Sequence, residues 1–269
     1  MRTAVVGHVE WVEFVRVEQV PTPGAIIQAS ESWTEAAGGG AVASVRLAAL
    51  TGRCTLYTAL GRDALGDASF TELTARGVGV EAARVPEPQR RGFTFVDAQG
   101  ERTITIIGEK HVPSGQDGLP WDELGETDAV YLVSGDAQAV KAARRARVLV
   151  ATARSLPVLQ EAGVELDALV RSARDPSERY EPGDLDPRPK LVVATDGRNG
   201  GTWQTAGGEE GSYKPALLGG PIVDAYGAGD SFAAGLTYAL GRGDDVAQAL
   251  DVAATCAAAA LRRRGAHGT

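Results

Sequence analysis

The stretch VDAYGAGDSF, residues 223–232, decides the fold because it joins a glycine-rich turn to the start of a helix. Two glycines and two aspartates lie within the seven positions from Asp224 to Asp230. Apolar residues then recur at intervals of four from Phe232 to Leu240, which predicts a helix with an apolar face. The turn could serve only to begin that helix, but the carboxylates that frame it favour a chemical role.

The residues of the turn suit an anion. Gly227, Ala228 and Gly229 can bring backbone N–H groups close together with no large side chain in the way. A helix N-terminus carries partial positive charge, so N–H groups gathered there can bind a phosphate. Asp230 would place a carboxylate beside that anion, which is unfavourable unless it does chemistry, such as accepting a proton from an attacking hydroxyl. The stretch therefore predicts an anion site with a general base.

Other motifs that bind nucleotides or metals fail on spacing. A dinucleotide fingerprint needs GxGxxG, but Phe232 stands at the third glycine position. A P-loop needs a lysine where this chain has Asp67. The three histidines, His8, His111 and His267, are scattered, which argues against a zinc site or a histidine-based triad.

Composition limits the class of protein. The chain has 269 residues, 43% of them hydrophobic, which fits one large α/β domain. A net charge of −8 argues against nucleic acid or an anionic membrane as the main partner. Cys54 and Cys256 form no CxxC pair and are expected to be core residues in a reducing compartment.

The N-terminal segment and the longest apolar run indicate a cytoplasmic protein. Glu10 and Glu13 interrupt the stretch where a signal peptide would need an apolar run. The longest near-apolar run, Val252–Leu261, is about half the ~20 residues that a membrane span needs. We therefore expect no membrane partner.

Strand-like and helix-like segments alternate along most of the chain, which predicts a mostly parallel sheet with helices on both faces. Helices are expected at 38–50, at 65–78 and in the Arg/Ala-rich segment after residue 134. Strands are expected at 2–6, 54–60, 128–134, 148–153, 166–170 and 191–195. The alternating runs 11–17 and 91–107, the latter a hairpin around a turn at 97–101, break this rhythm and predict a small second sheet over the ligand site.

These segments resemble a known family in their order. DAYGAGD, residues 224–230, resembles the D-T-x-G-A-G-D signature of ribokinase-like sugar kinases, the phosphofructokinase-B family. The helix start at Gly38–Gly40 resembles the family's first glycine motif, and TALGRDALG at 58–66 resembles its G-x-D-x-x-G turn. TDGRNG at 195–200 is similar to its T-x-G-x-x-G strand exit, and the Ala-rich segment 252–266 resembles its last helix.

The resemblance covers essentially the whole chain and implies its fold and partners. It implies one domain over residues 1–269, a three-layer α/β sandwich with a mostly parallel central sheet and a small β lid. The lid strands are expected within 9–37 and 89–108. The resemblance also implies transfer of the γ-phosphoryl group of ATP to a hydroxyl of a sugar or nucleoside, with Mg²⁺. We also expect a homodimer, because an apolar lid face needs covering.

The resemblance assigns site residues by position. Asp230 would be the base, with Gly227, Ala228 and Gly229 as the anion hole for the transferring phosphoryl group. The nucleotide would be bound by Thr195, Gly197, Gly200, Asp224, Gly227 and Gly229. The acceptor would be bound by Glu10, Glu13, Gly38, Gly39 and Asp230.

Four features depart from the family pattern. The family's N-terminal sugar-binding Asp, expected about five residues after Gly7, falls on Val12, which Glu10 and Glu13 flank. Ala225 replaces the family's Thr, and Val42 or Ala43 stands where an Asn usually follows the first glycine motif. The N-x-x-E element that organises magnesium has two candidates, Ser172-x-x-Asp175 and Asp175-x-x-Glu178, of which the second is preferred. Asp175 and Glu178 would then act on Mg²⁺ through water. These departures leave a ligand-binding protein without turnover as the alternative to an enzyme.

Overall fold

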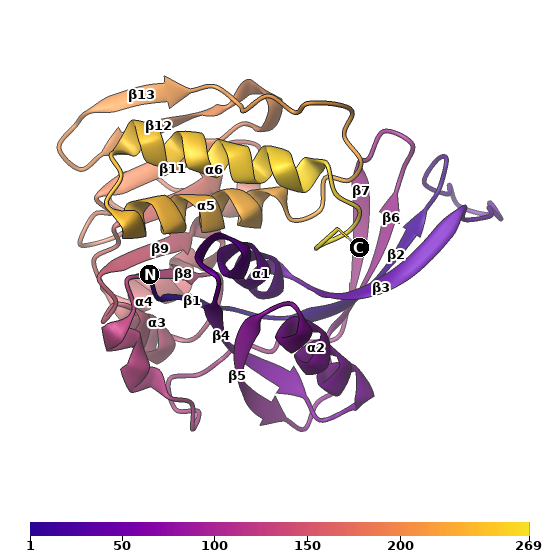
Figure 1. Cartoon of the computed structure of the whole chain (residues 1–269), viewed down its shortest axis with the longest axis horizontal. Coiled ribbons are helices and arrows are strands. Elements are labelled where there is room, and N and C mark those ends of the chain that lie inside the picture. Colours follow the sequence, from indigo (N-terminus) through magenta and orange to yellow (C-terminus); the bar gives the residue numbers. More distant parts are fainter. Residues whose placement is uncertain (269) are drawn as a thin grey trace.

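The computed structural model describes residues 1–268, which build a layered α/β body and a second, smaller sheet beside it (Figure 1). The sheet of the body has nine strands in the order β13-β12-β11-β10-β9-β8-β1-β4-β5. Neighbours from β11 to β5 run parallel, and β12 and β13 extend the edge in antiparallel fashion, so the predicted mostly parallel sheet is confirmed. The strands are β1 (Thr3–Val6), β4 (Cys54–Gly61), β5 (Val78–Val85), β8 (Ala129–Leu132), β9 (Val148–Thr152), β10 (Ala168–Ser172), β11 (Leu191–Thr195), β12 (Gly201–Thr205) and β13 (Glu210–Tyr213).

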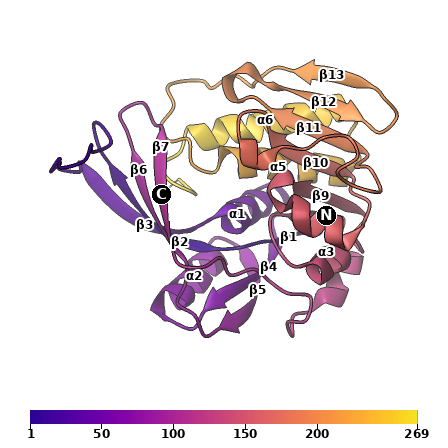
Figure 2. The same ribbon diagram turned by 180° about the vertical axis from the view of Figure 1, so that it is seen from behind.

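Helices cover both faces of this sheet (Figures 1 and 2). One face packs against α1 (Gly39–Thr51), α2 (Ala64–Ala75), α5 (Ala228–Arg242) and α6 (Val246–Leu261). The other packs against α3 (Ala137–Ala143) and α4 (Leu156–Ala162). Four short 3-10 turns complete the body: η1 (Trp121–Glu126), η2 (Ala153–Ser155), η3 (Pro176–Glu178) and η4 (Gly197–Asn199).

Strand β9 shows why the sheet is covered on both sides. Its residues are all buried, and successive side chains of a strand point to opposite faces. Val148 and Val150 pack with α1, α5 and α6, whereas Leu149 and Ala151 pack with α3 and α4. Strands that are apolar on both faces are typical of parallel sheets between two helical layers.

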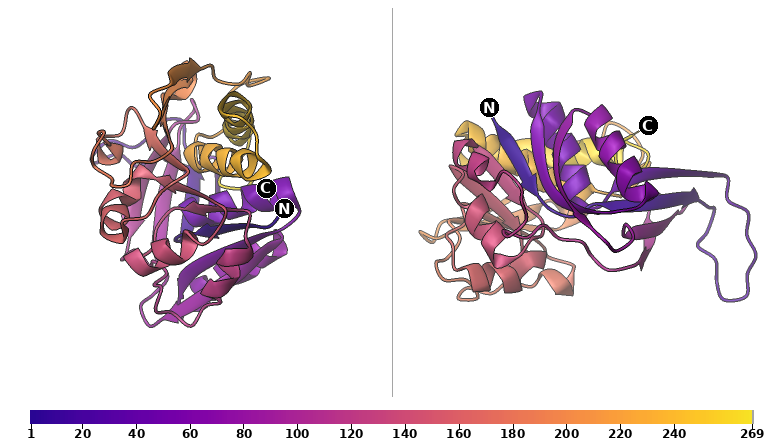
Figure 3. Two further views of the ribbon diagram at one scale, coloured as in Figure 1. Left: turned by 90° about the vertical axis from the view of Figure 1, so that its left-hand side faces the viewer. Right: turned by 90° about the horizontal axis from the view of Figure 1, so that it is seen from below.

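The second sheet has the order β3-β2-β6-β7 and projects from the body (Figure 3). Its strands are β2 (Glu10–Arg16), β3 (Glu31–Ala37), β6 (Arg91–Val96) and β7 (Arg102–Ile107). The predicted hairpin at 91–107 is therefore confirmed, and it leaves the main sheet as expected. We call this four-stranded sheet the lid.

Two further expectations concern the interior and the membrane. Cys54 and Cys256 are both buried and unpaired, as expected for core residues. Within the described part of the chain, no helix is both long enough and apolar enough to cross a lipid bilayer.

Candidate active site

The site lies where the chain changes direction within the main sheet. Strands β1 and β8 are neighbours, and from them the chain proceeds outward to β4 and β5 on one side and to β9, β10 and β11 on the other. In parallel α/β sheets, ligands bind at the carboxyl ends of the strands at such a point. His8 follows β1 and Ser134 follows β8, and His8 Nδ1 lies 3.1 Å from Ser134 Oγ.

Two helices begin at this point, and glycines let their starts meet. Gly38 precedes α1 with φ 84°, and Gly227 precedes α5 with φ 71°, backbone conformations that favour glycine. A Cβ added to Gly227 would lie 2.8 Å from Val42 Cγ1 on α1. A Cβ added to Gly39 would lie 2.9 Å from Asp230 Oδ1. The glycines predicted to bind ligand thus bring Asp230 against the start of α1.

Tyr226 and Asp224 brace the turn before α5. The Tyr226 hydroxyl accepts a hydrogen bond from the Gly38 N–H (3.1 Å), which ties the two helix starts together. Asp224 is fully buried, and its carboxylate accepts the N–H groups of Tyr226 (2.8 Å) and Gly265 (3.0 Å). The contacts of Asp224 are thus with the protein backbone, whereas the sequence had suggested a contact with the nucleotide.

The start of α5, where the sequence predicts an anion hole, has no cap from a side chain of the described residues, as is also true of α1 and α4. Side-chain oxygens cap α2, α3 and α6. A Cβ added to Gly229 would meet no heavy atom of the described residues within 4 Å. The first turn of α5 therefore has N–H groups that no described side chain caps, and room for a side chain at Gly229.

Asp230 lies in the first turn of α5 and is half-buried. Burial raises the pKa of its carboxyl group to about 6, against the lowering effects of Arg154 and Arg102. A carboxylate with a pKa near 6 is ionised at neutral pH and is still basic enough to accept a proton efficiently. The geometry and the pKa both suit a general base.

A group of charged residues surrounds Glu10 at the start of β2. Glu10 is buried, and its carboxylate Oε1 lies 2.9 Å from Arg90 Nε and 3.7 Å from His8 Nε2. Lys110 interacts electrostatically with Arg90, Glu10 and Asp230. Burial, followed by Lys110 and Arg90, lowers the pKa of His8 to about 3, so the imidazole is neutral at neutral pH. Two cations therefore face one buried carboxylate here.

Glu13 lies away from this group, on the other face of the lid. In β2, Val12 and Phe14 are fully buried and pack with Val42 and Tyr226, so the face that also carries Glu10 covers the two helix starts. Glu13 is exposed on the opposite face, because side chains alternate along a strand. The structure thus separates Glu13 from the predicted acceptor residues Glu10, Gly38 and Gly39.

The segment expected along the nucleotide forms a tight turn after β11. Gly197 and Gly200 both have positive φ, and a Cβ added to Gly200 would lie 2.0 Å from the Tyr213 carbonyl oxygen. The Thr195 hydroxyl donates to the Arg171 carbonyl oxygen (3.3 Å). The turn itself therefore requires glycine at both positions. It lies at the same edge of the sheet as the start of α5.

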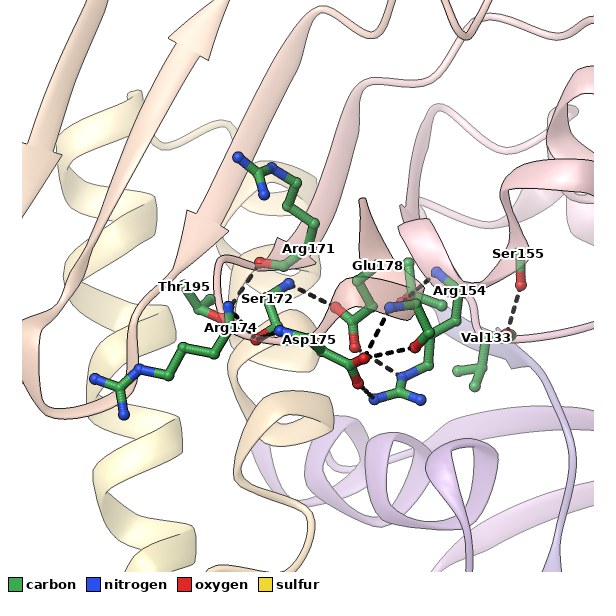
Figure 4. Close-up of polar contacts among 11 residues, drawn as sticks. Val133, Arg154, Ser155, Arg171, Ser172, Arg174, Asp175, Glu178 and Thr195 are labelled. Atoms are coloured by element: carbon green, nitrogen blue, oxygen red, sulfur yellow. Dashed lines mark hydrogen bonds and ion pairs between the residues drawn. The ribbon is translucent and has the colours of Figure 1, made fainter. Parts of the chain in front are cut away.

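The preferred magnesium element, Asp175 to Glu178, forms the short turn η3 after β10 (Figure 4). Glu178 is buried, and its Oε2 accepts the Ser172 N–H at 2.6 Å. The guanidinium of Arg154 lies between the two carboxylates, with Nε 2.7 Å from Glu178 Oε1 and Nη2 2.5 Å from Asp175 Oδ2. No cluster of three or more His, Cys, Asp or Glu side chains that could hold a metal ion occurs among the described residues.

Sequence reasoning did not assign site roles to His8, Arg90, Lys110, Arg154 and Tyr226. Each stands in a different segment, and only Tyr226 belongs to a glycine motif. Tyr226 alone carried a signal, since it lies within the DAYGAGD stretch at the one variable position of the signature.

Comparison with solved structures identifies the fold. Ribokinase from Thermotoga maritima aligns with a TM-score of 0.77 at 22% identity, over 98% of this chain and 94% of that chain. Arabidopsis thaliana ribokinase, solved with ribose and ATP, gives 0.75 at 22% identity, over 98% and 93%. Adenosine kinase from Sinorhizobium meliloti gives 0.78 at 18% identity, over 96% and 93%. The chain has the ribokinase fold, which sugar and nucleoside kinases share.

The family follows from the sequence comparison. The model of the pfkB family of carbohydrate kinases matches residues 2–177 and 165–269, so the chain belongs to that family. It is therefore an ATP-dependent kinase that phosphorylates a sugar-like substrate, not a ligand-binding protein without turnover. A curated relative, the ATP-dependent ribose-1-phosphate kinase of Halopiger xanaduensis, is 27% identical over 99% of this chain and 94% of that protein.

Proposed function

We propose that this kinase phosphorylates a sugar phosphate, with ribose 1-phosphate as the first candidate, and that Asp230 removes the proton from the attacking hydroxyl. The acceptor class is carried by two cations near Glu10: Arg90, whose Nε lies 2.9 Å from Glu10 Oε1, and Lys110, which interacts electrostatically with Glu10 and Asp230. Neutral ribose offers only hydrogen-bonding groups, whereas a sugar phosphate offers an anion that a guanidinium and an ammonium can bind with charge-assisted hydrogen bonds. The substrate named for the Halopiger xanaduensis relative supports the same class.

The roles divide by position. Gly39 packs closely against Asp230, since a Cβ there would lie 2.9 Å from Asp230 Oδ1 and 2.7 Å from Val133 Cγ1, and Gly38 lies against Glu10. These glycines would set the position of the two carboxylates that face the acceptor. The N–H groups of Gly227, Ala228 and Gly229 would hold the transferring phosphoryl group at the start of α5. Phosphoryl transfer needs mainly alignment and charge neutralisation, which this arrangement supplies.

Four residues predicted to bind the nucleotide would do so by shaping the backbone around it: Asp224, Thr195, Gly197 and Gly200. Asp224 would keep the anion hole in shape, since both its oxygens hold N–H groups of the turn and the C-terminal segment. The 195–200 turn would border the nucleotide, because it lies at the carboxyl edge of the sheet next to β10.

Mg²⁺ is the metal that the family's chemistry implies, and the donor set at η3 fits it. Asp175 and Glu178 offer carboxylate oxygens, the ligands that Mg²⁺ prefers, and Mg²⁺ commonly keeps several waters and contacts only one or two carboxylates. When bound, the ion would neutralise charge on the phosphates of ATP. Glu178 would orient its water shell.

The test compares acceptors. A coupled assay of ADP release is run with ribose 1-phosphate, ribose and adenosine. We expect kcat/KM to be highest for the sugar phosphate. Arg90→Gln should raise KM for ribose 1-phosphate by about tenfold or more, the usual loss for a charge-assisted hydrogen bond, with little change for ribose. The control is Arg91→Gln, which removes the next arginine, on the opposite face of the lid.

Two results would reject this acceptor. The first is a higher kcat/KM for ribose or adenosine than for ribose 1-phosphate. The second is an equal effect of Arg90→Gln on ribose and on ribose 1-phosphate, which would mean that the arginine only supports Glu10.

A further inference from the structure

Arg154 holds a position that no glycine motif or site prediction accounts for. It lies in η2, directly after β9, and its side chain is 56% exposed. Its electrostatic partners are Glu178, Asp175 and Asp230, so it stands between the magnesium element and the base. Because the side chain is largely exposed, packing does not explain its position at the carboxyl edge of the sheet.

The contacts of Arg154 occupy one oxygen of each carboxylate. In Glu178, Oε2 is taken by the Ser172 N–H and Oε1 faces Arg154 Nε at 2.7 Å. In Asp175, Oδ1 accepts the Ser177 N–H and hydroxyl, and Oδ2 faces Arg154 Nη2 at 2.5 Å. Figure 4 shows the guanidinium between the two carboxyl groups. The two oxygens that Arg154 contacts are thus the ones that do not accept hydrogen bonds from Ser172 or Ser177.

A metal ion and a guanidinium compete for the same carboxylate oxygens, because like charges repel at close range. Both are cations, and a divalent ion with its waters needs the oxygen side that Arg154 covers. The ion pair of Arg154 with Asp175 is open to solvent on both sides, with side chains 56% and 32% exposed, and such pairs are weak. The pair with the buried Glu178 is held more firmly, so its release requires another cation to replace the guanidinium. The ion pairs of Arg154 with Glu178 and Asp175 can therefore open when a divalent ion competes for the carboxylates.

We propose that Arg154 competes with Mg²⁺ for the two carboxylates. It pairs with Glu178 and Asp175 when no nucleotide is bound, and it has to release them before they can bind Mg²⁺ through its waters. The inference rests on the proposed role of Glu178 toward Mg²⁺. Arg154 is then a positioning residue that keeps the carboxylates ordered and makes metal binding weak until ATP arrives. Once released, its guanidinium remains beside Asp230, where the negative charge of the phosphates enters.

The test measures metal binding with no nucleotide and no acceptor present. Mn²⁺ replaces Mg²⁺ as the probe, and electron paramagnetic resonance gives its dissociation constant at pH 8. Arg154→Gln should bind Mn²⁺ about fivefold more tightly than the wild type or better, because the competing ion pair is gone. A purely structural role of Arg154 predicts the opposite, since loosening η3 would weaken the metal site.

Two controls make the result specific. Arg179→Gln removes an exposed arginine of the same segment that pairs with Glu181 instead, and it should leave Mn²⁺ affinity unchanged. Adding Glu178→Gln to the Arg154→Gln variant should abolish the gain. Equal, weaker or undetectable Mn²⁺ binding in Arg154→Gln would overturn the proposal, as would a gain that survives loss of Glu178. Neither outcome depends on acceptor choice, so the acceptor assay is a separate test.

Discussion

The raised pKa of Asp230 predicts a cost in stability that the variant Asp230→Asn should remove. Its pKa of about 6 in the folded chain compares with an ordinary value of 3.8. The folded state therefore binds the proton more tightly than the unfolded state, and ionisation of Asp230 destabilises the fold as pH rises from about 4 to above 6. At 1.36 kcal/mol per pH unit, the penalty is up to about 3 kcal/mol at pH 8 and about 1 kcal/mol at pH 4.5.

The assay is thermal unfolding of Asp230→Asn and the wild type at both pH values. At pH 8 the variant should melt about 3–9 °C higher, since 1 kcal/mol moves Tm by roughly 3 °C for a chain of this size. At pH 4.5 most of the difference should disappear. Asp251→Asn, which changes an exposed aspartate of α6, serves as the control and should change Tm little. A variant no more stable than the wild type at pH 8 would refute the claim that burial of the carboxylate raises its pKa.

Three further predictions concern the anion hole, the metal and the lid. Gly229→Val should weaken ATP binding by about tenfold or more while leaving Tm nearly unchanged, because the valine side chain would enter the space meant for phosphate and not the core. Calorimetry with ATP measures this, and a normal ATP affinity would contradict it. Glu178→Gln should raise the Mg²⁺ concentration needed for half-maximal activity by about tenfold with little change in acceptor KM; if Asp175→Asn shows that effect and Glu178→Gln does not, the magnesium element is misassigned. Light scattering at micromolar concentration should give a dimer. The outer lid face has a hollow of about 180 Å³ lined in part by Trp11 and Phe93, and a second copy would cover this apolar surface. A monomer would reject the dimer and leave the fold untouched.

The sequence predicted the elements that carry a local signal. The DAYGAGD turn needs glycine at positive φ before α5, and this requirement is visible without knowing the fold. The hairpin at 91–107 alternates around a turn, so its strands were recognisable as a unit outside the βα rhythm. The polar strand β3, ESWTEAA, lies within the range 9–37 expected for lid strands, but its own bounds were not predicted because it gains its order from pairing with β2.

The candidate site could be predicted only in part, because much of it depends on topology. Arg90 follows β5 and Lys110 follows β7, and both meet Glu10 through the path of the lid strands. Arg154 reaches Glu178 because β9 and β10 are neighbours in the sheet. The separation of Glu10 from Glu13 depends on which lid face covers the body, which a residue pattern alone does not reveal.

The most direct test of the account is the turnover of Asp230→Asn with ATP and whichever acceptor the wild type phosphorylates best. Asparagine keeps the size and hydrogen-bonding capacity of aspartate but cannot accept the proton. General-base catalysis contributes about 10²–10⁴-fold, so kcat should fall by at least roughly a hundredfold. ATP affinity should persist or increase, since a negative charge beside the phosphates is removed. Near-normal turnover in Asp230→Asn would contradict the assignment of the base and leave the Gly227–Gly229 turn as only the start of a helix.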